Sequence, residues 1–536
     1  MSGDVRIELA WFDHLVIVLY IVGILAHGLW VSRHREDADD YFLAGRALPW
    51  WLVGFSLYAS NMSGSSFVGL MGASYAEGLV VFNYEWTAAV VLVFFAFFML
   101  PHFLRSELWT IPQFLEERFD RRSRVAFSLF TILAVIFIDT AGALYAGGLV
   151  IATVFELALW QAVVALALVA GVYTVLGGLK AVVVTDTVQA ILLMMGGAAI
   201  FFFALRELGG WDAAMAALDA RGMGEADLIK APDHHFLPWP GIGGVLLLGF
   251  YYWTLNQFVV QRALGAASLD QGRKGAIFAG LLKVPNLAIM ILPGALAVLL
   301  YPGLDNPDLV FPTLAFDLLP VGFRGLILTA TLAAIMSSLD SALNAASTLV
   351  TMDFVKESRP ATSDDALVLV GRSVTVGVMV VAAVYAPMIA SFANLFEYFQ
   401  SVLAYVTPPM VAVYLMGIFW RRANRHGAFW TLVGALVMGV PLFITKEVTG
   451  AWAAWGLPDL HYTYMALLTF FGGCATLAAI SLLTPAPDAA HVARTTFTRE
   501  SWERDVASVE GPWWRDFRVQ SAGLLALVVG LIVWFR

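Results

Sequence analysis

The sequence is poor in charge and in cysteine. Only 13% of its 536 residues are charged, whereas 60% are hydrophobic, and the mean hydropathy is +0.78. A soluble chain of this length needs more charge to cover its surface, so the composition excludes a soluble globular protein. The single cysteine, Cys474, lies inside an apolar run, and no intrachain disulfide can form.

Several motifs of enzymes and of nucleic-acid-binding proteins are also missing. The chain has no GxxxxGK[ST] phosphate loop, no HExxH and no CxxC, so ATP-driven pumping and zinc or thiol chemistry have no support. The net charge of −9 is spread over many loops and forms no basic face, which argues against a nucleic-acid partner. No arrangement of a nucleophile with a base is visible, and we expect the protein not to be an enzyme.

Long apolar runs recur from one end of the chain to the other. Each run holds roughly 20 residues, enough for a helix to span about 30 Å of hydrocarbon. The first run has no basic stretch before it and no cleavage site after it, so we expect an anchor and not a signal peptide. The chain is predicted to be an all-α polytopic membrane protein with about 14 transmembrane helices. The predicted spans are 11–32, 49–75, 79–104, 126–155, 159–176, 184–205, 240–260, 275–300, 323–352, 370–391, 396–419, 428–444, 462–483 and 517–535.

The distribution of Lys and Arg predicts which loops are cytoplasmic. Basic residues cluster in segment 485–516 and in the loops that read SRHR, RFDRRSR, QGRK, KESR and RRANR. By the positive-inside rule these segments lie in the cytoplasm, which puts both chain ends outside. We therefore expect a multi-pass plasma-membrane protein, in the inner membrane if the cell is bacterial, with its N-terminus outside. The longest external loop, 207–240, has an amphipathic middle that is expected to form a short surface helix.

Four ionisable residues are predicted to lie within the membrane: Glu85, Asp186, Lys283 and Asp340. Such residues cost on the order of several kcal/mol each and usually mark a path for a substrate or an ion. The alternative is that they pair as structural contacts, Glu85 with Lys283 for instance. Four of them beside clusters of hydroxyl groups favour a functional role.

The segment AAIMSSLDSALNAASTLVTMD, residues 333–353, is rich in oxygen atoms for a membrane span. A dehydrated small cation needs several oxygen ligands, which hydroxyls and a freed carbonyl can supply. Small residues also line ordinary helix interfaces, but packing does not explain Asp340 in the same helix. Four small residues fall at i, i+3, i+4 and i+7 on one helix face: Ala334, Ser337, Ser338 and Ser341.

A second segment, ASNMSGSSFVG at 59–69, predicts a break in its helix. Gly64 and Gly69 stand among serines inside an apolar span. A break frees backbone carbonyls, including those of Ala59 and Met62, and irregular backbone at membrane depth is tolerated only where it lines a cavity or a site. A broken helix that faces a serine-rich helix predicts a cation site.

Several motifs resemble those of the sodium/solute symporters, and within them the sodium/sugar cotransporter branch. They are SLYASN (56–61), NYEW (83–86), TIPQFLEERF (110–119), GGLKAVVVTDTVQ (177–189), YYWTLNQFVVQR (251–262), MSSLDSALNAASTLVTMDF (336–354) and TPPMVAVYLMGIFWRR (407–422). The resemblance implies a LeuT-type core of two inverted five-helix repeats. The implied organisation is an N-terminal helix and loop (1–48), a first repeat (49–206), an external loop (207–238), a second repeat (239–419) and three C-terminal helices with an internal linker (420–536).

Carried over residue by residue, the resemblance also implies a main sodium site. Its ligands would be the carbonyls of Ala59, Met62 and Ala334 and the hydroxyls of Ser337 and Ser338. These are residues of the broken helix and of the serine-rich helix face described above, so the two lines of reasoning agree.

The implied sugar site combines polar groups with aromatic rings. Sugar hydroxyls both donate and accept hydrogen bonds, while rings cover the apolar C–H faces. Three positions depart from the family pattern: Ser66 replaces a Gln or His, and Ala88 and Gly249 replace a Ser and an Asn of one bacterial relative. These changes leave the identity of the sugar open. The expected binding residues are Asn61, Ser66, Glu85, Trp253, Lys283 and Gln400, with Tyr252 as a lid on the cytoplasmic side.

A second sodium site is a further hypothesis. Asp186 resembles a family aspartate near a second cation, and Asp340 and Ser341 lie one helical turn beyond the main site. Two carboxylates close together repel each other unless a cation lies between them. In the alternative interpretation, Asp340 accepts hydrogen bonds from a neighbouring helix and Asp186 caps its own.

The leading functional hypothesis is a sodium-coupled symporter that imports a sugar or polyol by alternating access. Sodium would be the co-transported ion, and the lipid bilayer the surrounding medium. A symporter of another small solute, such as an amino acid, a carboxylate or a sialic-acid-like compound, is the alternative, although Glu85 disfavours a carboxylate. A transporter-like sensor is disfavoured because the linker 485–516 offers no output domain. The oligomeric state stays open.

Overall fold

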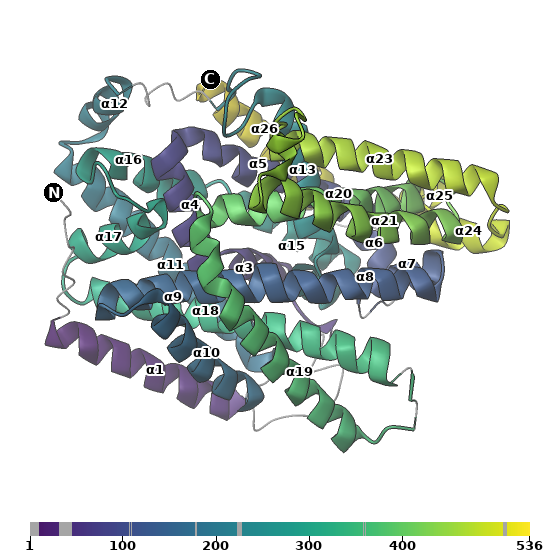
Figure 1. Ribbon diagram of the computed structural model, residues 1–536, viewed down its shortest axis with the longest axis horizontal. Coiled ribbons are helices and arrows are strands. Elements are labelled where there is room, and N and C mark those ends of the chain that lie inside the picture. The colour runs from purple at the N-terminus through teal and green to yellow at the C-terminus, as the bar shows by residue number, and fades with distance from the viewer. Residues whose placement is uncertain are drawn as a thin grey trace.

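The computed structural model describes residues 10–31, 46–106, 108, 110–176, 179–221, 228–356, 358–359, 361–507 and 512–535. Regular structure within these ranges is helical, apart from one isolated β-bridge between Leu48 and Ala266. Ten helices of the described part are long and apolar enough to cross a membrane. The predicted all-α membrane architecture is confirmed, while the count of fourteen spans stays a prediction. Figure 1 shows the helices packed side by side in one elongated bundle.

The first half of the chain contains α1 (Trp11–Val31), α3 (Trp50–Asn61), α4 (Gly64–Glu77), η2 (Gly78–Val81), α5 (Phe82–Phe94), η3 (Phe95–Met99), α6 (Leu100–Arg105), α7 (Ile111–Arg118), α8 (Arg121–Ala134), η4 (Val135–Thr140), α9 (Ala141–Phe155), α10 (Leu159–Leu176), α11 (Leu179–Glu207), α12 (Trp211–Asp219), η5 (Trp239–Gly241), α13 (Ile242–Phe250), η6 (Tyr251–Leu255) and α14 (Gln257–Leu264).

The second half contains α15 (Leu269–Leu282), η7 (Leu287–Ile291), α16 (Leu292–Leu300), η8 (Pro307–Leu309), α17 (Val310–Asp317), α18 (Phe323–Thr348), η9 (Leu349–Lys356), α19 (Asp364–Tyr385), η10 (Ala386–Ser391), α20 (Leu395–Phe419), α21 (Arg425–Phe443), η11 (Ile444–Val448), α22 (Ala451–Ala454), α23 (Tyr462–Leu483), α24 (Ala489–Thr495), α25 (Arg499–Ala507), η12 (Trp513–Arg515) and α26 (Phe517–Trp534).

The predicted break in the second span lies between α3 and α4. Helix α3 ends at Asn61, and α4 begins at Gly64, with the Ser63 side chain as its N-cap. A Cβ atom at Gly64 would lie 2.6 Å from Ile335 and 2.8 Å from Thr331, both in α18. Only glycine therefore lets the start of α4 approach α18 this closely. The break and the serine-rich helix, predicted separately from the sequence, pack against each other.

Several long helices contain a π-helical turn. Such turns occur in η3, η4, η6, η7, η9 and η11, each inside a predicted span or at its end. A single π-helical turn within an α-helix is rare and often marks a functional site. Two of these turns, η4 and η6, contribute side chains to the central cavity described below.

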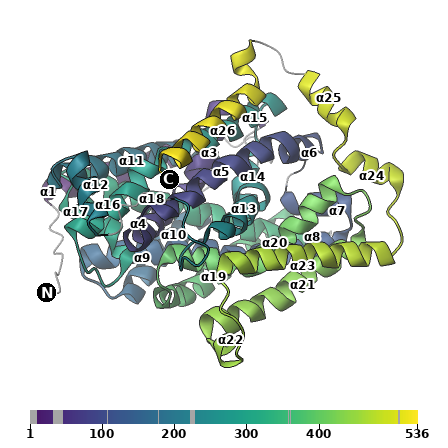
Figure 2. The same ribbon diagram turned by 90° about the horizontal axis from the view of Figure 1, so that it is seen from above.

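The two connecting segments that the sequence singled out are partly helical. The segment 207–240, which is expected to be external, contains a short helix as predicted, α12. The linker 485–516 contains α24 and α25, and Figure 2 shows it as an arm that returns from the end of α23 to α26. Asp505 holds this arm to the bundle through ion pairs with Arg105 and, at 3.2 Å, with Arg273.

Candidate functional site

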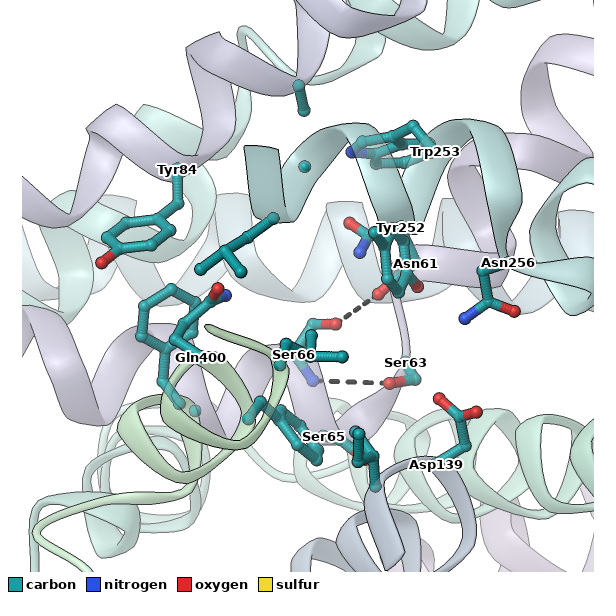
Figure 3. Close-up of a pocket in the computed structure, with 18 of the residues that line it drawn as sticks. Asn61, Ser63, Ser65, Ser66, Tyr84, Asp139, Tyr252, Trp253, Asn256 and Gln400 are labelled. Carbon is teal, nitrogen blue, oxygen red and sulfur yellow. Dashed lines mark hydrogen bonds between the residues drawn. The ribbon is translucent and has the colours of Figure 1, made fainter. Parts of the chain in front are cut away.

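A cavity of about 160 Å³ lies at the centre of the bundle, where α3, α4, α5, η4, η6, α18 and α20 meet (Figure 3). Its wall mixes hydroxyl, amide and charged groups with aromatic rings. Concave sites of this kind, mostly apolar with a few convergent polar groups, are typical of small-molecule binding. All seven residues predicted to bind the solute line this one cavity: Asn61, Ser66, Glu85, Tyr252, Trp253, Lys283 and Gln400.

Lys283 is the central charge of the cavity wall. Its ammonium group donates to Glu85 Oε2 at 3.0 Å and to Asn61 Oδ1. Lys283 and Glu85 are only 1% and 5% exposed. Buried charges persist when they are paired in this way. The expected pair of Glu85 and Lys283 is present, and both residues face the cavity as well.

Asn286 is a further hydrogen-bond partner of Glu85, and this role was not predicted from the sequence. It lies directly before η7, just after the turn that follows α15 and three residues after Lys283. Its side-chain N–H group donates to the same oxygen of Glu85. Asn286 Oδ1 in turn accepts from the hydroxyl of Tyr58 at 2.7 Å. The only signal in the sequence was an amide side chain directly before an apolar run.

Two aromatic rings lie close to the ammonium group of Lys283. The ring of Trp253 lies 5.1 Å from Lys283 Nζ and the ring of Tyr58 5.8 Å from it, within the range of a cation–π interaction. The π-helical turn η6 brings Tyr252 and Trp253 to the cavity, with their rings in an edge-to-face arrangement 5.2 Å apart. Figure 3 shows both rings on the side of Asn61.

Short side chains stand at the three positions that depart from the family pattern. The Ser66 hydroxyl donates a hydrogen bond to the carbonyl of Asn61 and so links the two sides of the break between α3 and α4. Ala88 and Gly249 both line the cavity. A Cβ atom at Gly249 would meet only Val91, at an ordinary 3.7 Å. Short side chains at these positions therefore leave space that longer polar ones would fill.

A second, much smaller cavity of about 10 Å³ adjoins the first. This volume corresponds to about one water-sized particle. All five residues predicted for the main sodium site line it: Ala59, Met62, Ala334, Ser337 and Ser338.

The local backbone of the small cavity leaves oxygen atoms available. The Ser63 N–H group donates to the Asn61 carbonyl at 3.0 Å, and not to Ala59 four residues earlier as in a continuous helix. The Ser338 hydroxyl donates to the Ala334 carbonyl at 2.9 Å. Because its hydrogen is used there, its lone pairs are free to face a cation.

The residues of the hypothetical second sodium site are brought together only in part. Ser341 lines the small cavity, and its hydroxyl has no hydrogen-bond partner among the described residues. Asp340 is buried but does not line that cavity. Asp186 lies in α11, and its side chain is outside the part that the structure describes.

Asp139 is a further ionisable residue of the cavity wall, so the sequence-based count of four was incomplete. It stands within the predicted span 126–155, in the segment VIFIDTAG, where a carboxylate between apolar residues is a visible signal. Asn256, whose Oδ1 caps α14 by accepting from the Phe258 N–H group at 3.1 Å, also lines the cavity and was not predicted.

These features define a class of protein before any comparison. A broken helix beside an oxygen-rich helix, with an ion-sized cavity next to a solute-sized one, is the arrangement of a secondary transporter of the LeuT type. The solved structure of a Na⁺-coupled sialic acid symporter in a substrate-bound, outward-open state has the same fold. The TM-score is 0.75 at 22% identity, covering 90% of this chain and 100% of that one.

Comparison with known sequences then identifies the family. The model of the sodium:solute symporter family matches residues 41–434. The sodium/glucose cotransporter of Vibrio parahaemolyticus is 35% identical over 464 residues, covering 81% of this chain and 85% of that protein. Sodium/myo-inositol cotransporter 2 of Oryctolagus cuniculus is 34% identical over 534 residues, covering 91% and 79%. The chain belongs to the sodium:solute symporter family, and it is a multi-pass, sodium-coupled membrane transporter and not an enzyme.

Proposed function

We propose that the protein imports a sugar or polyol together with sodium across the plasma membrane by alternating access. The observation that carries this proposal is the set of seven predicted solute residues around one cavity. Amide, carboxylate and ammonium groups can satisfy the hydroxyls of such a solute, while Tyr252 and Trp253 cover its apolar faces. Relatives at 34–35% identity are sodium/glucose and sodium/myo-inositol cotransporters, which supports the same substrate class.

The charges of the cavity disfavour the alternative of an acidic solute. In the described wall, Lys283 is the only cationic side chain, and it is paired with Glu85. A carboxylate or sialic-acid-like compound would find no unpaired cation there and would face Asp139 as well. Neutral hydroxyl groups carry no such penalty.

We place the main sodium ion in the small cavity, with the five predicted oxygen ligands. Two features support this site, namely its ion-sized volume and the availability of the Ala59 carbonyl and Ser338 hydroxyl oxygens. The small cavity and the solute cavity share Ser60, Phe258 and Ser338 as wall residues. A sodium ion that joins α3 to α18 would therefore also shape the solute cavity, which gives the coupling a physical basis.

The finer organisation is proposed on the same reasoning. The fourteen spans, the two inverted repeats at 49–206 and 239–419, and an external N-terminus follow from hydropathy, basic loops and family resemblance. A second sodium ion between Asp186, Asp340 and Ser341 is also proposed, supported by the unpartnered hydroxyl of Ser341.

The direct test is transport by the purified protein in liposomes. An inward sodium gradient should drive accumulation of labelled sugars or polyols, and potassium in place of sodium should abolish it. A panel that includes glucose, myo-inositol, amino acids and sialic acid would separate the proposed function from the alternatives. Sodium-driven uptake of an amino acid or sialic acid without uptake of any sugar or polyol would contradict the proposal.

A further inference from the structure

Asp139 is an ionisable residue of the solute cavity to which the proposed function gives no role. It lies in η4, the π-helical turn between α8 and α9. Both Asp139 and its neighbour Ile138 line the cavity, together with Ala134 and Ala143 from the flanking helices. A regular α-helix separates adjacent side chains by about 100°, so the π-helical turn widens the helix face that meets the cavity.

Within the described part of the chain, the carboxyl group of Asp139 makes no hydrogen bond and no ion pair. Figure 3 shows it pointing into the cavity on the side of Ser63 and Asn256, which are both neutral. The only cationic side chain of the described wall, Lys283, is already held by Glu85. Asp139 also acts electrostatically on the phenols of Tyr251, Tyr252 and Tyr398. Arg262, in the wall of the adjoining small cavity, acts on Tyr252 as well.

Other carboxylates buried in the bundle have partners. Asp308 accepts from the Tyr145 hydroxyl and from the Leu395 N–H group, both at 3.0 Å. Asp353 pairs with Arg124. An isolated carboxylate at membrane depth is costly and is usually kept because it meets a cation. Asp139 differs from these residues because it is only half-buried and its carboxyl group faces the cavity, where a group of the solute can reach it.

The formal charges of the described wall indicate which charge a partner of Asp139 should carry. Glu85 contributes −1, Lys283 +1 and Asp139 −1, so the sum is −1. A solute with one positive charge would bring the sum over this wall to zero, whereas a neutral sugar would leave it at −1. The aromatic rings of the wall add to the preference, since their faces attract ammonium groups.

We infer that the cavity selects a sugar or polyol that bears an amine, and that the ammonium group binds Asp139. This inference rests on the proposed function and narrows its substrate class. The hydroxyl groups of the solute would then face the Glu85, Lys283 and Gln400 side of the cavity. The ammonium group would lie near Asp139, within reach of Tyr252.

The test compares D-glucosamine with D-glucose and N-acetyl-D-glucosamine, which lack the charge. Sodium-driven uptake of each into proteoliposomes is measured at a pH where the amine of glucosamine is protonated. We expect glucosamine to be taken up with at least tenfold higher apparent affinity than the two neutral sugars. Asp139→Asn should reduce the ratio of glucosamine to glucose affinity by tenfold or more, and Asp139→Glu should restore part of it. Thermal unfolding of Asp139→Asn should occur at or above the wild-type temperature, because the substitution removes an unpartnered charge.

Three outcomes would overturn the inference. Equal affinities for glucosamine and glucose in the wild type would do so, and so would an equal loss for both in Asp139→Asn. Glucose uptake that rises with an inward proton gradient and loses this dependence in Asp139→Asn would assign the site to a proton instead. Sodium-driven glucose uptake without an amine preference would refute only the inference, whereas no sodium-driven uptake of any sugar or polyol in the wider panel would refute the proposed function too.

Discussion

Glu85→Gln is the substitution that most directly tests whether the charged groups of the solute cavity bind the solute. Glutamine keeps the shape of the side chain but removes its charge and offers one acceptor oxygen in place of two. In the structure, a single carboxylate oxygen of Glu85 accepts from Lys283 at 3.0 Å and from Asn286. A glutamine oxygen in the same position can still accept from both donors, but these become hydrogen bonds to a neutral acceptor, and an NH₂ group replaces the other carboxylate oxygen.

The size of the effect follows from these contacts. Hydrogen bonds to a charged group are worth about 1.5–3 kcal/mol. With about 1.4 kcal/mol per factor of ten, we expect the apparent solute affinity of Glu85→Gln to fall roughly ten- to hundredfold. Lys283 keeps its contact with Asn61 but loses its counter-charge while only 1% exposed, so the unfolding temperature should also fall.

The assay separates binding from stability. Sodium-driven solute uptake and thermal unfolding are measured for Glu85→Gln and for the double variant Glu85→Gln/Lys283→Met. Removing both charges should recover much of the lost stability but none of the solute affinity. Glu77→Gln, outside the cavity, makes the same chemical change and should leave solute affinity unaltered.

Two results would refute this reasoning. Solute affinity within twofold of wild type in Glu85→Gln would mean that Glu85 does not contact the solute. Recovery of both stability and uptake in the double variant would mean that the ion pair is only a structural contact. In either case the site would need to be assigned to other residues of the cavity.

Three further predictions concern the ion sites and the arm at 485–516. Ser338→Ala removes a proposed ligand and should weaken apparent sodium affinity tenfold or more in uptake titrations, whereas Ser347→Ala, in the same helix but in neither cavity wall, should not. The ratio of sodium to solute flux should be two in the wild type and one in Asp340→Ala; a wild-type ratio of one would contradict the second site. Asp505→Asn breaks the ion pairs with two arginines and should lower the unfolding temperature at unchanged solute affinity, while Glu503→Gln, in an exposed pair, should have little effect.

Much of the fold was predictable from the sequence because the membrane imposes strong constraints. Apolar length determined the spans, and glycines among serines predicted the break between α3 and α4. The π-helical turns were not predictable, because their hydrogen-bond shift depends on packing between helices and leaves no periodic signal. The partnership of Asn286 with Glu85 likewise depends on the turn after α15, which the sequence pattern does not specify.

Residues of the candidate site that lie close together in the sequence were predicted. Several residues that tertiary structure brings to the site were not. Ser337 and Ser338 lie on the oxygen-rich face of one helix, and the spacing along that helix predicted that they would line the same site, as they do in the small cavity. Asp139 was visible as a carboxylate in an apolar run, but its position in the cavity wall depends on η4.

The shared wall of the two cavities explains how sodium and solute can affect each other. Ser338 belongs to both, and its helix α18 packs directly against the start of α4 at Gly64. A cation bound at the proposed site would favour the arrangement in which α3 and α18 lie together, and both of these elements also contribute to the wall of the solute cavity. Thermodynamic linkage then requires that the solute raise sodium affinity by the same factor by which sodium raises solute affinity. A transporter built in this way needs no long-range signal, because one pair of elements forms part of both binding sites.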